Sequence, residues 1–141
     1  MRPSLQQRRI ARRGVTAVEF AMVAPIVFLL IFSGIEFARV NTLWHTASNA
    51  AYEGARRGMV PGATAQDVED TANSVLNTVA AKYTNITVVP AVILPNTDQV
   101  TVEIDVPLDA NAWVVPRFFK NRTVSTSCTL NRELIEMVIV P

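Results

Sequence analysis

Chemically reactive side chains are scarce in this sequence. Its 141 residues include one cysteine, Cys128, and one histidine, His45. A single sulfur can form neither an intramolecular disulfide nor a thiolate metal site, so we expect Cys128 to fill an apolar strand position, with an intermolecular bridge as the alternative. A Ser-His-Asp arrangement would have to use His45, which has no nucleophile motif nearby, and metal-ligand spacings and phosphate-binding glycine loops are missing too. The sequence therefore predicts a protein that is not an enzyme and uses no cofactor, metal or small-molecule substrate.

Acidic residues are missing from the first 14 positions, where five of the 13 lysine and arginine residues occur. Residues 15–141 hold the other eight basic residues and all twelve acidic ones. A basic tip on an acidic body indicates a membrane or nucleic-acid contact at the tip. Because an apolar run follows at once, we interpret the basic residues as a membrane topology signal and expect no nucleic-acid partner. Four of them form two adjacent pairs: Arg8, Arg9, Arg12 and Arg13.

One apolar run is long enough to cross a membrane. Val15 to Ile35 contains a single charged residue, Glu19, and as a helix it would be about 30 Å long, the thickness of the hydrocarbon core of a bilayer. A cleaved secretory signal would have a shorter apolar stretch followed by a small-residue cleavage site, and a buried helix of a soluble protein would leave the arginine flank without a role. The positive-inside rule then predicts a single-pass protein with a cytoplasmic N-terminus and everything beyond about Phe37 across the membrane.

The helical pattern continues beyond this run. Apolar and small residues recur at helical spacing as far as about Arg57, and Gly58 supplies the stop. A helix from the start of the apolar run to this point would be about 60 Å long, half of it outside the bilayer. A second helix is predicted to begin at Thr64, which can cap the amide of Asp67, and to end near Lys82.

Beyond the second helix the apolar period changes to two, which is typical of β-strands. Residues 100–106 alternate strictly between apolar and polar, and residues 86–94 are predicted to pair with them as a hairpin. Pro90 places its strand at an edge or forces a bulge. Residues 123–130 form a third predicted strand, and Met137 to Val140 a fourth short strand or a tail. The fold class is therefore α+β: a long N-terminal transmembrane helix, extending into a small domain with a second helix and a three- to four-stranded antiparallel sheet.

The boundary between the basic and apolar runs resembles a known processing site. Residues 13–20, RGVTAVEF, are similar to the site of type IVb (Flp-type) prepilins. In that family a membrane peptidase cuts after the glycine and leaves glutamate at position five and an aromatic residue at six. The resemblance implies cleavage between Gly14 and Val15, and makes Glu19 and Phe20 candidate assembly residues. Cleavage would free an α-amino group on Val15 with an ordinary pKa of about 8. That cation could pair with Glu19 of a neighbouring subunit; the alternative is that Glu19 reaches back to the lipid headgroups.

Longer segments carry a wider resemblance. Residues 12–40, 49–73, 100–119 and 123–133 resemble the TadE-like proteins, minor pseudopilins of the tight-adherence (Tad/Flp, type IVb) pilus systems. The resemblance covers about residues 12–133.

This resemblance implies a pilin-like fold and a structural role. Residues 1–14 would be the basic leader, 15–36 the transmembrane helix and 37–141 an extracytoplasmic domain. The protein would be a minor pilin-like subunit in a bacterial inner membrane, able to enter an extracellular pilus and involved in pilus biogenesis and surface adherence. Its expected partners are the prepilin peptidase, other pilin-like subunits, the inner-membrane pilus platform and the lipid bilayer. The alternative is a signal-anchored periplasmic ligand-binding or interaction module, in which Gly14 and Glu19 would be dispensable.

Overall fold

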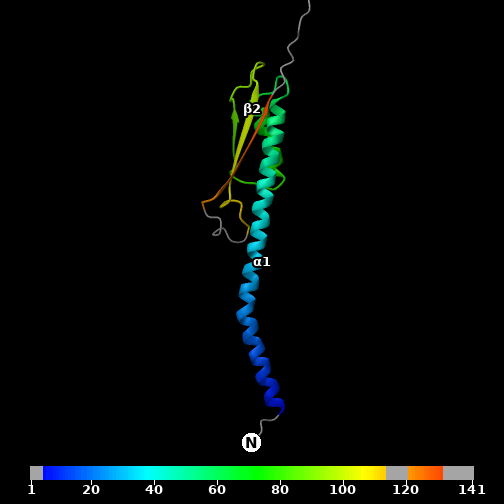
Figure 1. Ribbon diagram of the computed structural model, residues 1–141, viewed down its shortest axis with the longest axis vertical. Helices are drawn as coiled ribbons and strands as arrows, with labels where there is room; N and C mark the ends of the chain where they lie inside the picture. The colour runs from blue at the N-terminus through cyan, green and yellow to red at the C-terminus, as the bar shows by residue number, and fades with distance from the viewer. Residues whose placement is uncertain (1–4, 114–120, 132–141) are drawn as a thin grey trace, which may run out of the picture.

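The computed structural model describes residues 5–113 and 121–131, with side chains from residue 14 onward. The described part of the chain is an α+β structure, as the sequence predicts. Figure 1 shows one long helix whose N-terminal half extends away from the rest of the molecule, while its C-terminal half lies along a small sheet and a second helix. The elements are α1 (Leu5–Gly58), α2 (Ala65–Asn77), β1 (Asn85–Val89), β2 (Gln99–Pro107) and β3 (Thr123–Asn131).

Helix α1 is continuous over 54 residues, a length of about 80 Å. It ends at Gly58 as predicted, but it begins ten residues before Val15. Residues 5–13, LQQRRIARR, consist mostly of arginine and glutamine, which are good helix formers. Gly14 costs only about 1 kcal/mol relative to alanine, which is too little to stop the helix. Pro25 lies inside the helix without ending it.

Helix α2 begins where the sequence predicts and ends earlier. Thr64 is its N-cap: its hydroxyl accepts from the Asp67 amide, and the Asp67 carboxylate accepts from the Thr64 amide, which makes a capping box. The predicted end near Lys82 is wrong, because the helix stops at Asn77. Ala80 adopts a left-handed φ of 51°, and the amides of Ala80 and Ala81 donate to the carbonyls of Asn77 and Leu76. These two hydrogen bonds form a Schellman motif, in which alanine occupies the left-handed position where glycine is usual.

The three described strands form an antiparallel sheet in the order β1-β2-β3. β1 and β2 are the predicted hairpin, with a turn in which the Thr97 amide donates to the Leu94 carbonyl. The first strand ends at Val89 rather than Leu94, because Pro90 has no N–H to continue the ladder, and β1 lies at an edge as predicted. The expected fourth strand, Met137 to Val140, lies outside the described residues.

The helices cover one face of the sheet and form the core with it. Small residues on α1 allow close packing: a Cβ on Gly54 would lie 3.3 Å from the Val68 carbonyl oxygen, and one on Gly58 would lie 2.9 Å from a methyl group of Val100. Cys128 lies on the inner face of β3, half-buried against this core, which confirms the predicted strand position. The main buried side chains are Leu43, Ala47, Ala51, Val68, Ala72, Leu76, Val100, Val102, Ile104 and Val106.

Candidate functional site

The N-terminal half of α1 exposes its apolar side chains all round. In residues 14–35, which we call the bare segment, every residue is exposed except Ala24 and Ser33, which are half-buried. Among the described residues, α1 is the helix long and apolar enough to cross a membrane, and none of its apolar window is buried in the rest of the structure. A helix that is apolar on all sides is stable only when something else surrounds it, such as lipid or other helices. The bare segment is therefore the candidate site of membrane anchoring.

The predicted processing residues lie at the start of the bare segment. Gly14 lies inside a continuous helix, near its N-terminal end, and a Cβ there would have no atom within 4 Å. Val15 and Glu19 are four residues apart, which is about one helical turn, so they lie on the same face of α1. Glu19 is exposed and Phe20 is 72% exposed. The structure thus leaves these predicted residues accessible to another molecule.

The four arginines of the predicted topology signal, Arg8, Arg9, Arg12 and Arg13, lie on the same helix, immediately before the bare segment. Their backbone is helical, and their side chains lie outside the described part of the structure.

A polar cluster joins the end of the bare segment to the domain. It consists of Glu36 and Arg39 on α1 with Asn111 and Trp113 in the loop after β2, and we call it the junction cluster. Glu36 is 1% exposed, and its carboxylate accepts a hydrogen bond of 2.9 Å from the backbone amide of Trp113. Arg39 is 8% exposed, and its guanidinium lies 4.9 Å from the centre of the Trp113 ring. Burial lowers the pKa of Arg39, and the neighbouring Glu36 charge opposes that shift.

Asn111 is the centre of the junction cluster. Its side-chain amide donates to the carbonyls of Lys82 and Pro107 at 2.9 and 2.8 Å, and its amide oxygen accepts from the Lys82 amide at 2.8 Å. The Asn111 carbonyl also accepts from Arg39 Nε at 3.3 Å, while Arg39 Nη2 donates to the Val79 carbonyl at 2.8 Å. Three chain segments are thereby tied together beside the end of the bare segment.

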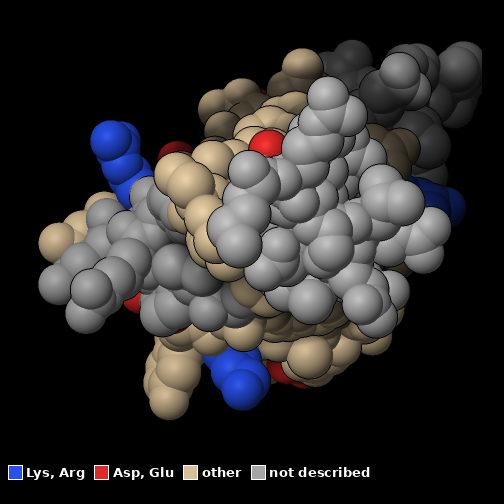
Figure 2. Space-filling view, turned by 90° about the horizontal axis from the view of Figure 1, so that it is seen from below, with Lys and Arg blue, Asp and Glu red and all other residues tan. Residues whose placement is uncertain are grey.

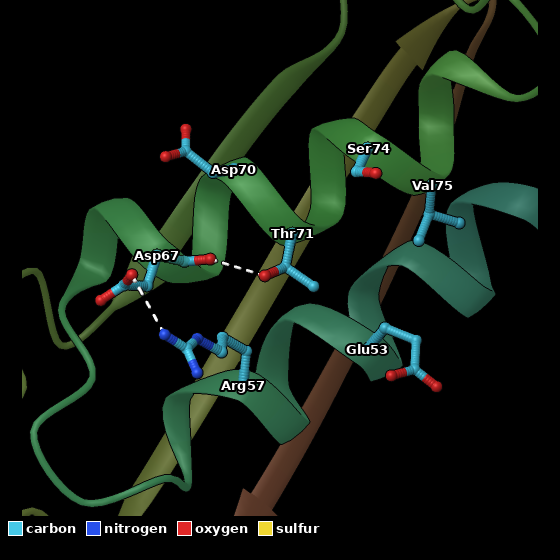
Figure 3. Close-up of a pocket in the computed structure, with 7 residues that line it drawn as sticks. All are labelled: Glu53, Arg57, Asp67, Asp70, Thr71, Ser74 and Val75. Atoms are coloured by element: carbon cyan, nitrogen blue, oxygen red, sulfur yellow. Dashed lines mark hydrogen bonds and ion pairs between the residues drawn. The ribbon is translucent and has the colours of Figure 1, made fainter.

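A second polar site is the broad groove between α1 and α2 shown in Figure 3, about 710 Å³ in volume. Its Arg57 donates to Asp67 at 3.3 Å, and Asp67 also closes the helix cap. Hydrogen bonds from the Thr64 backbone and side chain, and then from Arg57, lower the pKa of Asp67. In Figure 3 Glu53 and Asp70 lie on opposite sides of the groove and point away from this pair. Among the described residues of the groove, the Arg57–Asp67 pair thus links the two helices, while the other two carboxylates point away from it.

The junction cluster is the part of the site that the sequence analysis missed. Glu36 and Arg39 are in phase with the buried Leu43 and Ala47 on one face of α1. Charged residues on the buried stripe of a helix indicate a partner elsewhere in the chain. That signal was present in the sequence, but the identities of the partners, Trp113 for Glu36 and Asn111 for Arg39, were not.

The comparisons with known proteins bear on the same helix. The family model described as TadE-like protein matches residues 14–56, which run from the start of the bare segment almost to the end of α1. No curated protein and no solved structure matches the chain. TadE-like proteins form a structural, pilus-associated family. Over residues 14–56 the chain is thus similar to TadE-like proteins, as its sequence predicts, and this similarity associates it with the Tad pilus system.

Proposed function

We propose that this protein is a minor pilin-like subunit of a Tad-type (type IVb) pilus, held in the bacterial inner membrane by α1 with its N-terminus in the cytoplasm. A prepilin peptidase removes residues 1–14, and the mature chain takes part in pilus biogenesis and surface adherence. The observation that carries this proposal is the bare segment: an apolar helix exposed on all sides, continuous with a folded domain, within the residues that match TadE-like proteins.

The position of Gly14 supports processing at the Gly14–Val15 bond. A peptidase needs an extended backbone at the bond it cuts, and this bond lies inside a helix. Glycine is the residue that makes local unwinding easiest, apart from proline, because it lowers helix stability by about 1 kcal/mol relative to alanine. The open surroundings of Gly14 leave room for an enzyme to approach.

The exposure of Glu19 supports a role in assembly. None of the described side chains pairs with it, and a lone carboxylate within the bilayer costs about 2.5 kcal/mol or more. The α-amino group that cleavage would create on Val15 is one turn away on the same face. In a neighbouring subunit this cation could pair with Glu19, so that neither charge is left alone in the apolar environment.

The experiment that tests the proposal separates insertion from assembly. Glu19→Ala removes the carboxylate and adds no bulk, so the protein should still be found in the membrane fraction. Its amount in sheared pili, or the amount of pili if the subunit acts in initiation, should fall about tenfold or more, because the partner cation would remain buried without its counter-charge. Glu103→Ala is the matched control, since it removes an exposed carboxylate from the outer face of β2.

Normal piliation with Glu19→Ala would contradict the pairing with Val15. If Gly14→Ala were also without effect, a signal-anchored interaction module would explain the chain better, because that alternative requires neither residue.

A further inference from the structure

A small cavity opens beside the junction cluster, at the end of the domain closest to the bare segment. Its volume is about 190 Å³. It lies between α1, the turn that follows α2 and the loop after β2. The charged, amide and aromatic side chains that line the cavity are Arg39, Lys82, Asn111 and Trp113.

The position of this cavity along α1 indicates where it would lie relative to a bilayer. Arg39 follows the last residue of the bare segment, Ile35, by four positions, which is about 6 Å along a helix. The polar headgroup region of a bilayer extends about 5 to 8 Å on each side of a hydrocarbon core of about 30 Å. If the bare segment spans the core, as the proposed function requires, the cavity lies at the level of the lipid headgroups.

Two cationic side chains, Arg39 and Lys82, line the cavity. The Arg39 guanidinium is held by the Val79 and Asn111 carbonyls and lies against the Trp113 ring. The Lys82 side chain is exposed, and no described carboxylate pairs with it. Glu36 interacts electrostatically with Arg39 and partly offsets its charge, so Lys82 supplies the cavity with an excess of positive charge.

Aromatic side chains at the same end of the domain also fit a membrane surface. Trp113 is 70% exposed and Tyr83, next to Lys82, is 83% exposed. Large exposed aromatic rings are unusual on a soluble surface, whereas tryptophan and tyrosine are enriched where proteins meet lipid headgroups.

The other charged surfaces of the described structure suit an anion less well. The groove between α1 and α2 contains Glu53, Asp67 and Asp70, which would repel it. In the view from below, the described lysine and arginine side chains that are visible lie at separate points around the molecule (Figure 2). A general electrostatic attraction to a membrane is therefore a poorer explanation than one local site.

We propose that this cavity binds the phosphate of an anionic phospholipid headgroup, in the leaflet on the side of the domain. Lys82 attracts the phosphate, Arg39 forms the fixed wall, and Trp113 and Tyr83 lie among the headgroups and glycerol backbones. Such a site would hold the domain at a fixed height above the bilayer. The inference depends on the membrane span of the proposed function, but not on processing or pilus assembly.

The test uses the full-length protein in nanodiscs containing equal amounts of phosphatidylglycerol and phosphatidylcholine. Native mass spectrometry after release from the nanodisc should show phosphatidylglycerol retained in preference to phosphatidylcholine. Lys82→Gln should lower that retention about fivefold, the change that corresponds to about 1 kcal/mol for one basic residue at an anionic surface. The fold should survive, because Asn111 is bound by the Lys82 backbone and not by its side chain.

Arg56→Gln is the matched control, because Arg56 is an exposed cation near the opposite end of the domain. It should leave lipid retention unchanged. Equal retention of the two lipids, or equal losses in the Lys82 and Arg56 variants, would overturn the proposal. Displacement of the lipid by inorganic phosphate at millimolar concentration would also overturn it, since the ligand would then be a soluble anion. None of these results depends on whether the protein enters a pilus. A negative result for lipid binding would therefore not contradict the proposed function.

Discussion

The Glu36 carboxylate accepts a hydrogen bond from the Trp113 amide, although the two residues are 77 positions apart in the chain. Glu36 is the first residue after the bare segment, and Trp113 lies in the loop after β2. Because α1 continues through this point without a break, the bond fixes the domain against the helix where the helix enters it. A rotation of the span in a membrane or a filament would therefore rotate the domain with it.

Loss of Asn111 should loosen this connection. Asn111→Ala leaves the Lys82 amide and the Lys82 and Pro107 carbonyls without their partner. Unsatisfied buried polar groups cost about 1–3 kcal/mol each, and water will reach some of these, so we expect a loss of about 3 kcal/mol in the free energy of unfolding. Thermal unfolding of the detergent-solubilised protein, followed by circular dichroism, measures it.

The control for this prediction is Asn73→Ala, on the exposed face of α2. It should change stability by no more than about 0.5 kcal/mol. Similar unfolding midpoints for the two variants would mean that Asn111 does not organise the junction.

Gly14→Ala should block processing without harming the fold. The new methyl group meets no atom within 4 Å, and alanine stabilises the helix by about 1 kcal/mol, which alone lowers the unwound fraction about fivefold. The peptidase must also accommodate a side chain where none was present. The fraction of processed protein in an immunoblot of whole cells gives the result.

Gly34→Ala is the matched substitution, because Gly34 lies in the same exposed helix and also has open space around it. Processing should be normal in that variant. If both variants, or neither, were processed like the unaltered protein, Gly14 would have no special role.

The cap of α2 should make the domain sensitive to acid. The pKa of Asp67 is lowered in the folded state, mainly by hydrogen bonds from Thr64. The ionised Asp67 carboxylate therefore contributes fully to the stability of the fold above the unfolded-state pKa of about 3.9. This contribution is lost as the pH falls through the lower pKa of the folded state. Thr64→Ala should cost about 1 kcal/mol at neutral pH and weaken this acid dependence.

Ser74→Ala removes a hydroxyl group from the same groove but from outside the cap, and it should preserve both the stability and its acid dependence. Unfolding midpoints measured between pH 7 and the acid limit of the protein distinguish the two variants. Equal acid dependence in both would show that the cap does not act through Asp67.

Much of the fold could be predicted because its signals are local. The alternation of apolar residues in β2, the cap at Thr64 and the stop at Gly58 each depend on a few neighbouring residues, and all three are confirmed. The start of α1 was mispredicted because the apolar pattern begins at Val15, whereas helix propensity alone carries the helix back to Leu5.

The errors and omissions concern features without a local signal. The end of α2 depends on a left-handed alanine, Ala80, whose conformation is stabilised by the surrounding structure and not by its residue type. Burial of Glu36 and Arg39 depends on the loop after β2, where the Trp113 amide donates to Glu36 and the Asn111 carbonyl accepts from Arg39, and these residues are more than 70 positions away in the sequence. The processing and assembly residues, Gly14 and Glu19, stay predictions, since their partners are other molecules.

The position of the mature N-terminus shows whether this chain is processed as a pilin-like subunit. The protein should be extracted from membranes of cells that contain a prepilin peptidase, and its intact mass measured together with that of a sample from peptidase-deficient cells. We expect a chain beginning at Val15 in the first sample and a chain that retains residues 1–14 in the second. A mature protein that begins anywhere else, or that keeps Met1 in the presence of the peptidase, would contradict this expectation.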